Sequence, residues 1–456
     1  MKGISPFLKK KTLVVGLGKS GVSAARWLSE NGAKVTVSDI KSESEMDDKL
    51  LKEAKRLGIG LEMGAHTIET FLDVDLIVVS PGVPLQITPL KLARERGIPI
   101  IGELELAARL TDTPLIAVTG TNGKSTTTAL LGYLIEKAGF KVFVGGNIGT
   151  PIMDYVSGHG KADYIVAEVS SFQLDTIEEF SPFVSVLLNI SPDHLGRYEN
   201  YEAYIQSKFR IFQNQGQGQY AVLNDDDERL SRLHPSGKGS VLRYGLEKGE
   251  NRQAFISQKK IGIRYPGPDV HYFEINGFKL SGAHNIENLM GAILVCYALQ
   301  IDPQIIQASI NQFHGLPHRL EWVGRYRGVD FYDDSKATNV DAAVKAVKGF
   351  DRPIVLIAGG RHKGADYLPL VKAAKDRVKK AIFLGEAKHL MGTSFKDIIP
   401  FAMADNMQEA VHQAFSSAEP KDVVLLAPAC SSFDMFSDYA HRGDVFKAIV
   451  RRLDHD

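Results

Sequence analysis

The sequence predicts an α/β protein of three domains, each built on a doubly wound and mostly parallel sheet. Its 456 residues allow about three domains at roughly 150 residues each. Short apolar, β-branched runs alternate with helical patterns, as expected for parallel strands buried on both faces. The expected strands are 13–15, 35–37, 76–79, 116–118, 165–167, 184–188, 354–357 and 423–426, and the expected helices include 20–30, 125–138 and 340–347.

Polar, proline-containing stretches between these runs mark the domain boundaries. Thr111-Asp112-Thr113-Pro114 lies just before a new strand, and the second boundary falls near Gly315-Leu316-Pro317. We therefore expect domains at residues 1–110, 111–315 and 316–456. Between Ser236 and Gly282, alternating segments separated by glycines predict an antiparallel appendage to the middle domain.

Composition excludes several classes of protein. The 54 basic and 54 acidic side chains cancel, so no global positive field would recruit nucleic acid or an anionic membrane. The two cysteines, Cys296 and Cys430, are far apart and lack metal-ligand spacing, which fits a reducing compartment. The N-terminus has no apolar core of a signal peptide, and no run approaches the ~18 apolar residues of a membrane span. We expect a cytoplasmic monomer that acts on small molecules.

The strongest motif is Gly120-Thr121-Asn122-Gly123-Lys124-Ser125-Thr126, which follows the expected strand 115–118 and opens a helix. Glycines let backbone N–H groups close around phosphate oxygens, Lys124 can reach the β and γ phosphates, and the Ser125 hydroxyl can ligate Mg²⁺. The usual spacing would place a glycine at position 118, where this chain has Val118, so the loop is a shorter variant. The motif predicts ATP binding.

A second glycine-rich turn, Gly16-Leu17-Gly18-Lys19-Ser20-Gly21, also lies between a strand and a helix. Asp39 ends the next strand, where an acidic residue can bind ribose hydroxyls. Taken alone, the turn suggests NAD. A UDP-linked substrate fits it equally well, because the pattern indicates only a turn that accepts a nucleotide diphosphate.

Further candidates lie at strand ends. Glu168 comes directly after the expected strand 164–167, and Asp193 and His194 come after the expected strand 184–189. The carboxyl ends of parallel strands face the ligand, so Glu168 can reach a Mg²⁺ held by Ser125. Lys208 lies in an amphipathic helix, where its residue pattern alone predicts a surface lysine.

These motifs, taken together, resemble the Mur ligases over essentially the whole chain. The resemblance is carried by the two glycine-rich segments and by residues 80–82, 146–149, 168–173, 192–194, 284–285, 318–319, 334–339 and 428–434. It implies that ATP phosphorylates the terminal carboxylate of UDP-N-acetylmuramoyl-L-alanine, that D-glutamate attacks the acyl phosphate, and that phosphate then leaves. It also implies Rossmann-like N- and C-terminal domains around a central phosphate-loop domain.

The resemblance also assigns roles to single residues. It implies two Mg²⁺ ions, one held by Ser125 and Glu168 and the other by His194, with Lys208 as a carbamylated lysine beside them. Gly196 stands where the family commonly has an aspartate. The remaining implied contacts are Asn288, Arg319 and Asp334 for ATP; Ser20, Asp39, Lys41, Asn147, Ser170 and Gln173 for the UDP-linked substrate; and Thr338, Lys363, Ser432 and Tyr439 for D-glutamate.

Three rival interpretations remain open at this point. A folylpolyglutamate synthase shares the ATP loop and the acyl-phosphate chemistry, but residues 1–110 count against it. An NAD-dependent oxidoreductase explains residues 16–21 and leaves the Lys124 loop without a role. A nucleotide-driven switch or motor would use ATP without ligation.

Overall fold

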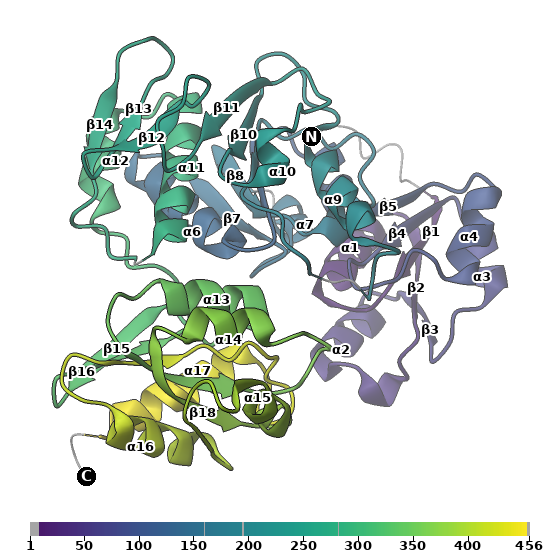
Figure 1. Cartoon of the computed structure of the whole chain (residues 1–456). Coiled ribbons are helices and arrows are strands. Elements are labelled where there is room, and N and C mark those ends of the chain that lie inside the picture. Colours follow the sequence, from purple (N-terminus) through teal and green to yellow (C-terminus); the bar gives the residue numbers. More distant parts are fainter. Residues whose placement is uncertain (1–8, 159, 194–195, 281, 454–456) are drawn as a thin grey trace. The chain divides into compact units, whose positions relative to one another are not determined.

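The computed structural model of the chain describes residues 9–158, 160–193, 196–280 and 282–453 (Figure 1). The chain divides into two compact units. One runs up to Glu274 and includes Leu289–Ser309, and the other consists of Ile275–Asn288 and the residues from Ile310 onward. In the described ranges, no helix is both long enough and apolar enough to cross a membrane.

The first unit begins with a sheet of five parallel strands in the order β3-β2-β1-β4-β5. Alternate residues of β1 enter different apolar clusters, since Val14 packs with Val37 while Leu13 and Val15 pack with Ile77. Both faces are therefore covered, as a doubly wound sheet requires. The elements are β1 (Lys11–Val15), α1 (Lys19–Glu30), β2 (Lys34–Asp39), η1 (Glu43–Glu45), α2 (Asp48–Arg56), β3 (Gly60–Met63), α3 (Ile68–Leu72), β4 (Leu76–Val79), α4 (Thr88–Glu95), β5 (Ile100–Gly102) and α5 (Glu103–Leu110).

The second sheet has nine strands in the order β14-β13-β12-β11-β10-β9-β6-β8-β7. Its strand β6, between β9 and β8, has every residue buried, and helix α6 is the next element along the chain. The elements up to the appendage are β6 (Leu115–Thr119), α6 (Lys124–Lys137), β7 (Val142–Gly146), α7 (Ile152–Ser157), β8 (Tyr164–Glu168), α8 (Ser171–Leu174), β9 (Val184–Leu187), α9 (Tyr201–Phe209), η2 (Arg210–Phe212), β10 (Tyr220–Asn224) and α10 (Glu228–Ser231). They are followed by β11 (Ser240–Tyr244), β12 (Ala254–Ser257), β13 (Lys260–Ile263), β14 (His271–Glu274), α11 (Ala283–Ala298) and α12 (Pro303–Ile310).

The second unit contains a six-stranded sheet in the order β15-β16-β20-β17-β18-β19. Its only antiparallel pair among the described strands is β15 with β16; the other pairs are parallel. Helices cover both of its faces (Figure 1). The elements are β15 (Glu321–Tyr326), β16 (Val329–Asp333), α13 (Val340–Lys348), β17 (Ile354–Gly359), α14 (Leu368–Ala374), β18 (Val378–Leu384), α15 (Lys388–Phe395), β19 (Phe401–Met403), α16 (Met407–Ser417), β20 (Val423–Leu426) and α17 (Tyr439–Val450).

The predicted fold class is confirmed: the chain has three α/β sheets whose strands are mostly parallel. The predicted appendage is only partly antiparallel, because β11 pairs in parallel with β10 and β12, while β12, β13 and β14 pair antiparallel. These strands extend the central sheet instead of standing apart from it. The boundaries near residues 110 and 315 stay a prediction, since the two compact units interleave between 275 and 310.

Candidate active site

The phosphate loop connects β6 to α6, as the sequence predicts. Gly120 has φ +153° and Gly123 has φ +86°, in a region that residues with a side chain rarely adopt. The loop is fastened to the end of β9, because the Asn122 N–H donates to Oδ1 of Asn189 at 2.9 Å and Nδ2 of Asn189 donates to the Asn122 carbonyl at 3.0 Å. Ser125 and Thr126 are buried in the first turn of α6. The backbone N–H groups of a helix N-terminus are a favourable place for phosphate oxygens.

Two lysines converge on this loop. Nζ of Lys124 donates to the carbonyls of Gly120 and Thr121, both at 2.8 Å, and Nζ of Lys208 donates to the same Gly120 carbonyl at 3.0 Å. Lys208 lies on α9 and is 2 % exposed, so the surface position that its pattern predicted is wrong. Burial, and then the charge of Lys124, hold the pKa of Lys208 well below its usual value.

Helix α9 faces the loop through residues one turn apart. The Tyr204 hydroxyl lies 3.0 Å from Oγ1 of Thr121, and Nζ of Lys208 lies 4.8 Å from the centre of the Tyr204 ring. An amphipathic pattern indicates that one face of a helix is buried, but not what that face meets. The tertiary structure therefore decides that Lys208 belongs to the phosphate loop.

Glu168 ends β8, next to β6 in the sheet, and is buried. Its Oε1 accepts a hydrogen bond of 2.7 Å from Nδ2 of Asn147. Its Oε2 is also buried, and no hydrogen-bond partner for it occurs among the described residues. A buried carboxylate oxygen without a donor is costly unless a cation meets it. The Ser125 hydroxyl and the Glu168 carboxylate are oxygen ligands of the kind that a hard cation such as Mg²⁺ prefers. His194 lies outside the described residues.

The N-terminal glycine-rich turn is shaped by close packing. A Cβ on Gly21 would lie 1.9 Å from the Gly16 carbonyl oxygen, so only glycine fits at this position. Asp39 stabilises the turn directly: its Oδ2 accepts from the Leu17 N–H at 2.7 Å and its Oδ1 from the Lys41 N–H at 2.9 Å. Ser20 lies in the first turn of α1, beside this turn. Asp39 therefore holds the shape of the turn, a role that its position at a strand end did not reveal.

The predicted contacts to the muramoyl part of the substrate surround the end of β8. Asn147 is exposed beside Glu168, and Ser170 and Gln173 form a capping box at the start of α8. The Ser170 N–H donates to Oε1 of Gln173 at 2.9 Å, while the Gln173 N–H donates to Oγ of Ser170 at 3.3 Å. Both side chains thus stabilise the helix start.

In the second unit, Arg319 and Asp334 lie close enough to interact electrostatically. Burial raises the pKa of Asp334 to about 7, and the charge of Arg319 opposes this rise. Nδ2 of Asn288 lies 3.4 Å from Oδ1 of Asn285 in the first turns of α11. Asn288, Arg319 and Asp334 are the three residues outside the phosphate loop that the resemblance implies as contacts to ATP.

Three of the four residues assigned to D-glutamate follow the carboxyl ends of strands in the third sheet. Thr338 follows β16, Lys363 follows β17 and Ser432 follows β20, which are neighbouring strands. The loops touch each other, since the Ala429 N–H donates to the Ala337 carbonyl and the Arg361 N–H to the Ser431 carbonyl, both at 2.9 Å. Ser432 is buried and Lys363 is exposed, while Tyr439 begins α17.

Sequence reasoning missed Arg442, which holds these loops together. Its side chain is 1 % exposed. The guanidinium donates to Oγ of Ser335 at 2.9 Å, to the Ser335 carbonyl at 2.8 Å and to the Cys430 carbonyl at 3.2 and 3.3 Å. An arginine in an amphipathic helix is usually exposed, so no local signal marked it.

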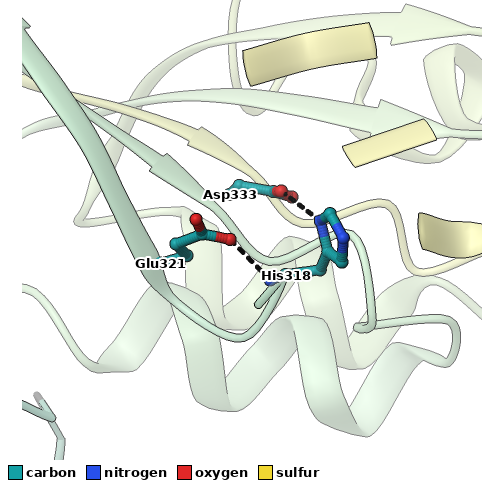
Figure 2. A group of neighbouring side chains, drawn as sticks. All are labelled: His318, Glu321 and Asp333. Atoms are coloured by element: carbon teal, nitrogen blue, oxygen red, sulfur yellow. Dashed lines mark hydrogen bonds and ion pairs between the residues drawn. The ribbon is translucent and has the colours of Figure 1, made fainter. Parts of the chain in front are cut away.

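A cluster of His318, Glu321 and Asp333 has ligand atoms close enough for a metal ion (Figure 2). Those atoms are already paired. Nδ1 of His318 lies 2.7 Å from Oδ2 of Asp333, the His318 N–H donates to Oε2 of Glu321 at 2.8 Å, and Nζ of Lys447 pairs with the same Glu321 oxygen at 3.1 Å. The cluster thus fixes the segment that carries Arg319.

Comparisons with known proteins match the chain from near its start to its third sheet. Three family profiles fit consecutive parts: "Mur ligase MurD-like, N-terminal domain" over residues 10–102, "Mur ligase middle domain" over 118–296, and "Mur ligase, glutamate ligase domain" over 318–430. A UDP-N-acetylmuramoylalanine–D-glutamate ligase of Geotalea uraniireducens is 45 % identical over 98 % of this chain and 98 % of its own length.

Solved structures share the fold at low identity. A pseudomurein peptide ligase type C from Methanothermus fervidus is 21 % identical, with a TM-score of 0.60 over 97 % of this chain and 100 % of its own. A MurF ligase from Thermotoga maritima in complex with ADP is 15 % identical, with a TM-score of 0.58 over 99 % of this chain and 98 % of its own.

Proposed function

The chain belongs to the Mur ligase family, and we propose that it is the ATP-dependent ligase that adds D-glutamate to UDP-N-acetylmuramoyl-L-alanine in peptidoglycan precursor synthesis. The observation that carries this proposal within the site is the convergence of Lys124 and Lys208 on the Gly120 carbonyl. Glu168 also acts electrostatically on Lys208, and its buried Oε2 has no hydrogen-bond partner among the described residues.

The chemistry follows from the weakness of a carboxylate as an electrophile. A carboxylate repels an amine and has no good leaving group, whereas an acyl phosphate has one. ATP therefore transfers its γ-phosphoryl group to the substrate carboxylate, and the D-glutamate amine then displaces phosphate to form the amide. Transfer of a phosphoryl group depends mainly on positioning and charge neutralisation. Lys124, aimed at the loop that would cradle the phosphates, supplies a fixed positive charge for this step.

Two Mg²⁺ ions would be held by Ser125 and Glu168 on one side and by His194 on the other. When bound, they would neutralise the negative charge of the phosphates. Glu168 fits this role because its buried Oε2 has no donor in the described part of the chain. Asn147 keeps the other oxygen of Glu168 oriented through its hydrogen bond of 2.7 Å.

Lys208 would act as a carbamate. Its lowered pKa favours the neutral amine, which can attack CO₂; an N–C bond forms and a proton is released. The carbamate carries one negative charge and two oxygens, so it would suit divalent cations where an ammonium group would repel them. Burial of Lys208 near the charge of Lys124 supports this modification, because both make a protonated Lys208 unfavourable.

The third sheet would select the amino acid. Lys363 would supply a charge and Ser432 a directional hydrogen bond to the carboxylate of D-glutamate, with Thr338 and Tyr439 beside them. Asn288, Arg319 and Asp334 would contact ATP, and Ser20, Asp39 and Lys41 would lie where the uridine diphosphate binds. The match over residues 10–102 supports a UDP-linked substrate there instead of NAD.

Phosphate release tests the proposal. The purified protein is supplied with UDP-N-acetylmuramoyl-L-alanine, ATP and Mg²⁺, and a panel of D- and L-amino acids is added one at a time. We expect sustained release only with D-glutamate, and mass spectrometry should find one glutamate added to the UDP-linked product. Equal release without any amino acid would indicate a nucleotide-driven switch, and a preference for another amino acid would indicate a different ligase.

A further inference from the structure

Arg197 connects the segment between β9 and α9 to the N-terminal sheet. It follows Asp193 by four residues and lies in the segment between β9 and α9. Its guanidinium donates to the carbonyls of three consecutive residues, Pro81 at 3.3 Å, Gly82 at 2.8 Å, and Val83. These carbonyls belong to the loop that follows β4. One side chain of the central sheet thus holds the backbone of a loop of the N-terminal sheet.

The other side of Arg197 rests on an aromatic ring. Its guanidinium carbon lies 4.7 Å from the centre of the Phe172 ring, and that ring stacks on Tyr198 with 5.9 Å between the ring centres. The cavity beside these side chains measures about 20 Å³, room for about one water molecule. The Arg197 guanidinium is therefore held between the carbonyls of the loop and the face of the Phe172 ring.

The loop that Arg197 holds is packed on the glycine-rich turn. Oγ of Ser80 donates to the Gly16 carbonyl at 2.9 Å, and the Ser80 N–H donates to the Val15 carbonyl at 2.9 Å. A Cβ on Gly16 would lie 3.0 Å from Cβ of Ser80. Because the two segments are in close contact, a displacement of the loop would change the shape of the turn.

The segment that contains Arg197 leads directly into α9, the helix that carries Lys208. The Tyr198 hydroxyl donates to Oδ2 of Asp175 at 2.9 Å, and its oxygen lies 3.3 Å from Oγ of Ser207. Oγ of Ser207 donates in turn to the Ser171 carbonyl at 2.8 Å. The segment around Arg197 is therefore held by residues of the central sheet's domain. Through its hydrogen bonds, Arg197 can keep the loop of residues 80–83 in one position.

We infer that Arg197 is a positioning residue for the UDP-linked substrate, acting through the loop of residues 80–83 on the glycine-rich turn. The inference rests on the proposed function, which places the uridine diphosphate at that turn. Arginine suits the task because its planar guanidinium offers five N–H donors in a fixed fork, enough for three carbonyls at once. A lysine carries a single ammonium group and keeps the charge without this fork.

Two variants and a matched control test the inference. Arg197→Ala removes the contacts, Arg197→Lys keeps only the charge, and Arg264→Ala is the control. Nη2 of Arg264 also lies within hydrogen-bond distance of three backbone carbonyls, those of Gly249 at 2.9 Å, Glu250 at 2.6 Å and Arg252 at 3.2 Å, but these belong to the segment between β11 and β12. KM is measured for all three substrates, and UDP is titrated calorimetrically into the full chain.

With Arg197→Ala, we expect KM for the UDP-linked substrate and Kd for UDP to rise by about tenfold, since several hydrogen bonds of modest net worth are lost. KM for ATP and for D-glutamate should stay within about twofold, because the phosphate loop and the third sheet are untouched. Arg197→Lys should show a smaller rise in the same KM. Arg264→Ala should leave all three KM values unchanged. If Arg197→Ala does not fold, as judged by its thermal unfolding, the same selective rise in Arg197→Lys still supports the inference.

Other outcomes overturn it. Arg197 is a merely structural residue if Arg197→Ala and Arg197→Lys alter only the melting temperature, or if they raise all three KM values together. A wild-type chain that neither binds UDP nor turns over would remove the proposed function itself. An active wild type whose Arg197 variants keep the normal KM for the UDP-linked substrate removes only this inference.

Discussion

Glu103 is expected to destabilise the protein at alkaline pH, and Glu103→Gln is expected to remove that effect. Glu103 begins α5 and is 2 % exposed. Its Oε1 accepts a hydrogen bond of 2.7 Å from the Met153 N–H, and no partner for Oε2 occurs among the described residues. Burial raises the pKa of this carboxyl group from an ordinary 4.5 to about 7, and the charge of Asp154 adds to the rise while the N–H donors oppose it.

The sign and the size follow from proton linkage. The folded state holds the Glu103 proton more tightly than the unfolded state does. The free energy of unfolding is therefore highest below about pH 4.5, and it falls as the pH rises from there to about 7. The pKa rise corresponds to roughly 3 kcal/mol at about 1.4 kcal/mol per pH unit. Glutamine resembles the protonated carboxyl group and does not ionise. The gain in unfolding free energy of Glu103→Gln over the parent should therefore be up to roughly 3 kcal/mol larger at pH 8 than at pH 5.

Glu105 provides a matched control with the opposite sign. It is also fully buried on α5, but its carboxylate accepts backbone N–H bonds from Glu178, Glu179 and Phe180, all at 2.9 Å. It also pairs with Nε of Arg109 at 2.7 Å. Glu105→Gln removes the charge from these hydrogen bonds, so we expect it to lower stability at pH 8.

Urea unfolding followed by tryptophan fluorescence measures both variants. The chain has two tryptophans, and Trp27 lies in the first unit while Trp322 lies in the second. A Trp322→Phe background therefore reports the unit that contains Glu103. If Glu103→Gln shifts the unfolding free energy equally at pH 5 and pH 8, or lowers it more at pH 8, Glu103 is not held protonated and the reasoning fails.

Four further predictions concern function. Lys124→Ala should abolish turnover and leave the far-UV circular dichroism unchanged, because it removes a charge aimed at the transferring phosphoryl group; activity within about threefold of the parent would contradict this role. Lys208→Ala should be nearly inactive and partly restored by a small added carboxylic acid, whereas full activity without it would argue against a carbamate. Lys363→Ala should raise KM for D-glutamate by about tenfold or more, since an ionic hydrogen bond is worth about 1.5–3 kcal/mol, and a rise confined to the UDP-linked substrate would place the amino-acid pocket elsewhere. Calorimetric titration of the full chain should detect UDP binding and no micromolar binding of NAD, which an oxidoreductase would bind.

Much of the fold could be predicted because its signals are local. The strands at 13–15, 116–118 and 423–426 are short β-branched runs, and each is found where the pattern places it. The phosphate loop could be predicted for the same reason, since its glycines, Lys124 and the flanking strand and helix are contiguous in the chain. The parallel pairing of β11 could not, because a short alternating segment does not specify the direction of its partner.

The site was predictable only where its residues follow strands. Glu168 was found because it ends a strand, but the orphaned oxygen that makes it a ligand candidate is visible only in the folded chain. Asp39 was correctly expected at a strand end, yet its carboxylate holds the Leu17 and Lys41 N–H groups. Arg197 carried no signal, because its acceptors are backbone carbonyls more than a hundred residues away.

By itself, the sequence determined the α/β class, the phosphate loop and, through the assembled motifs, the resemblance to the Mur ligases. Each of these depends on neighbouring residues, whose spacing sets the period of an element or the shape of a turn. The tertiary structure alone decided that Lys208 is buried against Gly120, that Arg197 holds the loop of residues 80–83 and that Arg442 joins the loops of the third sheet. These contacts join segments distant in the chain, and a side chain's burial and charge environment are set by whatever the fold brings against it.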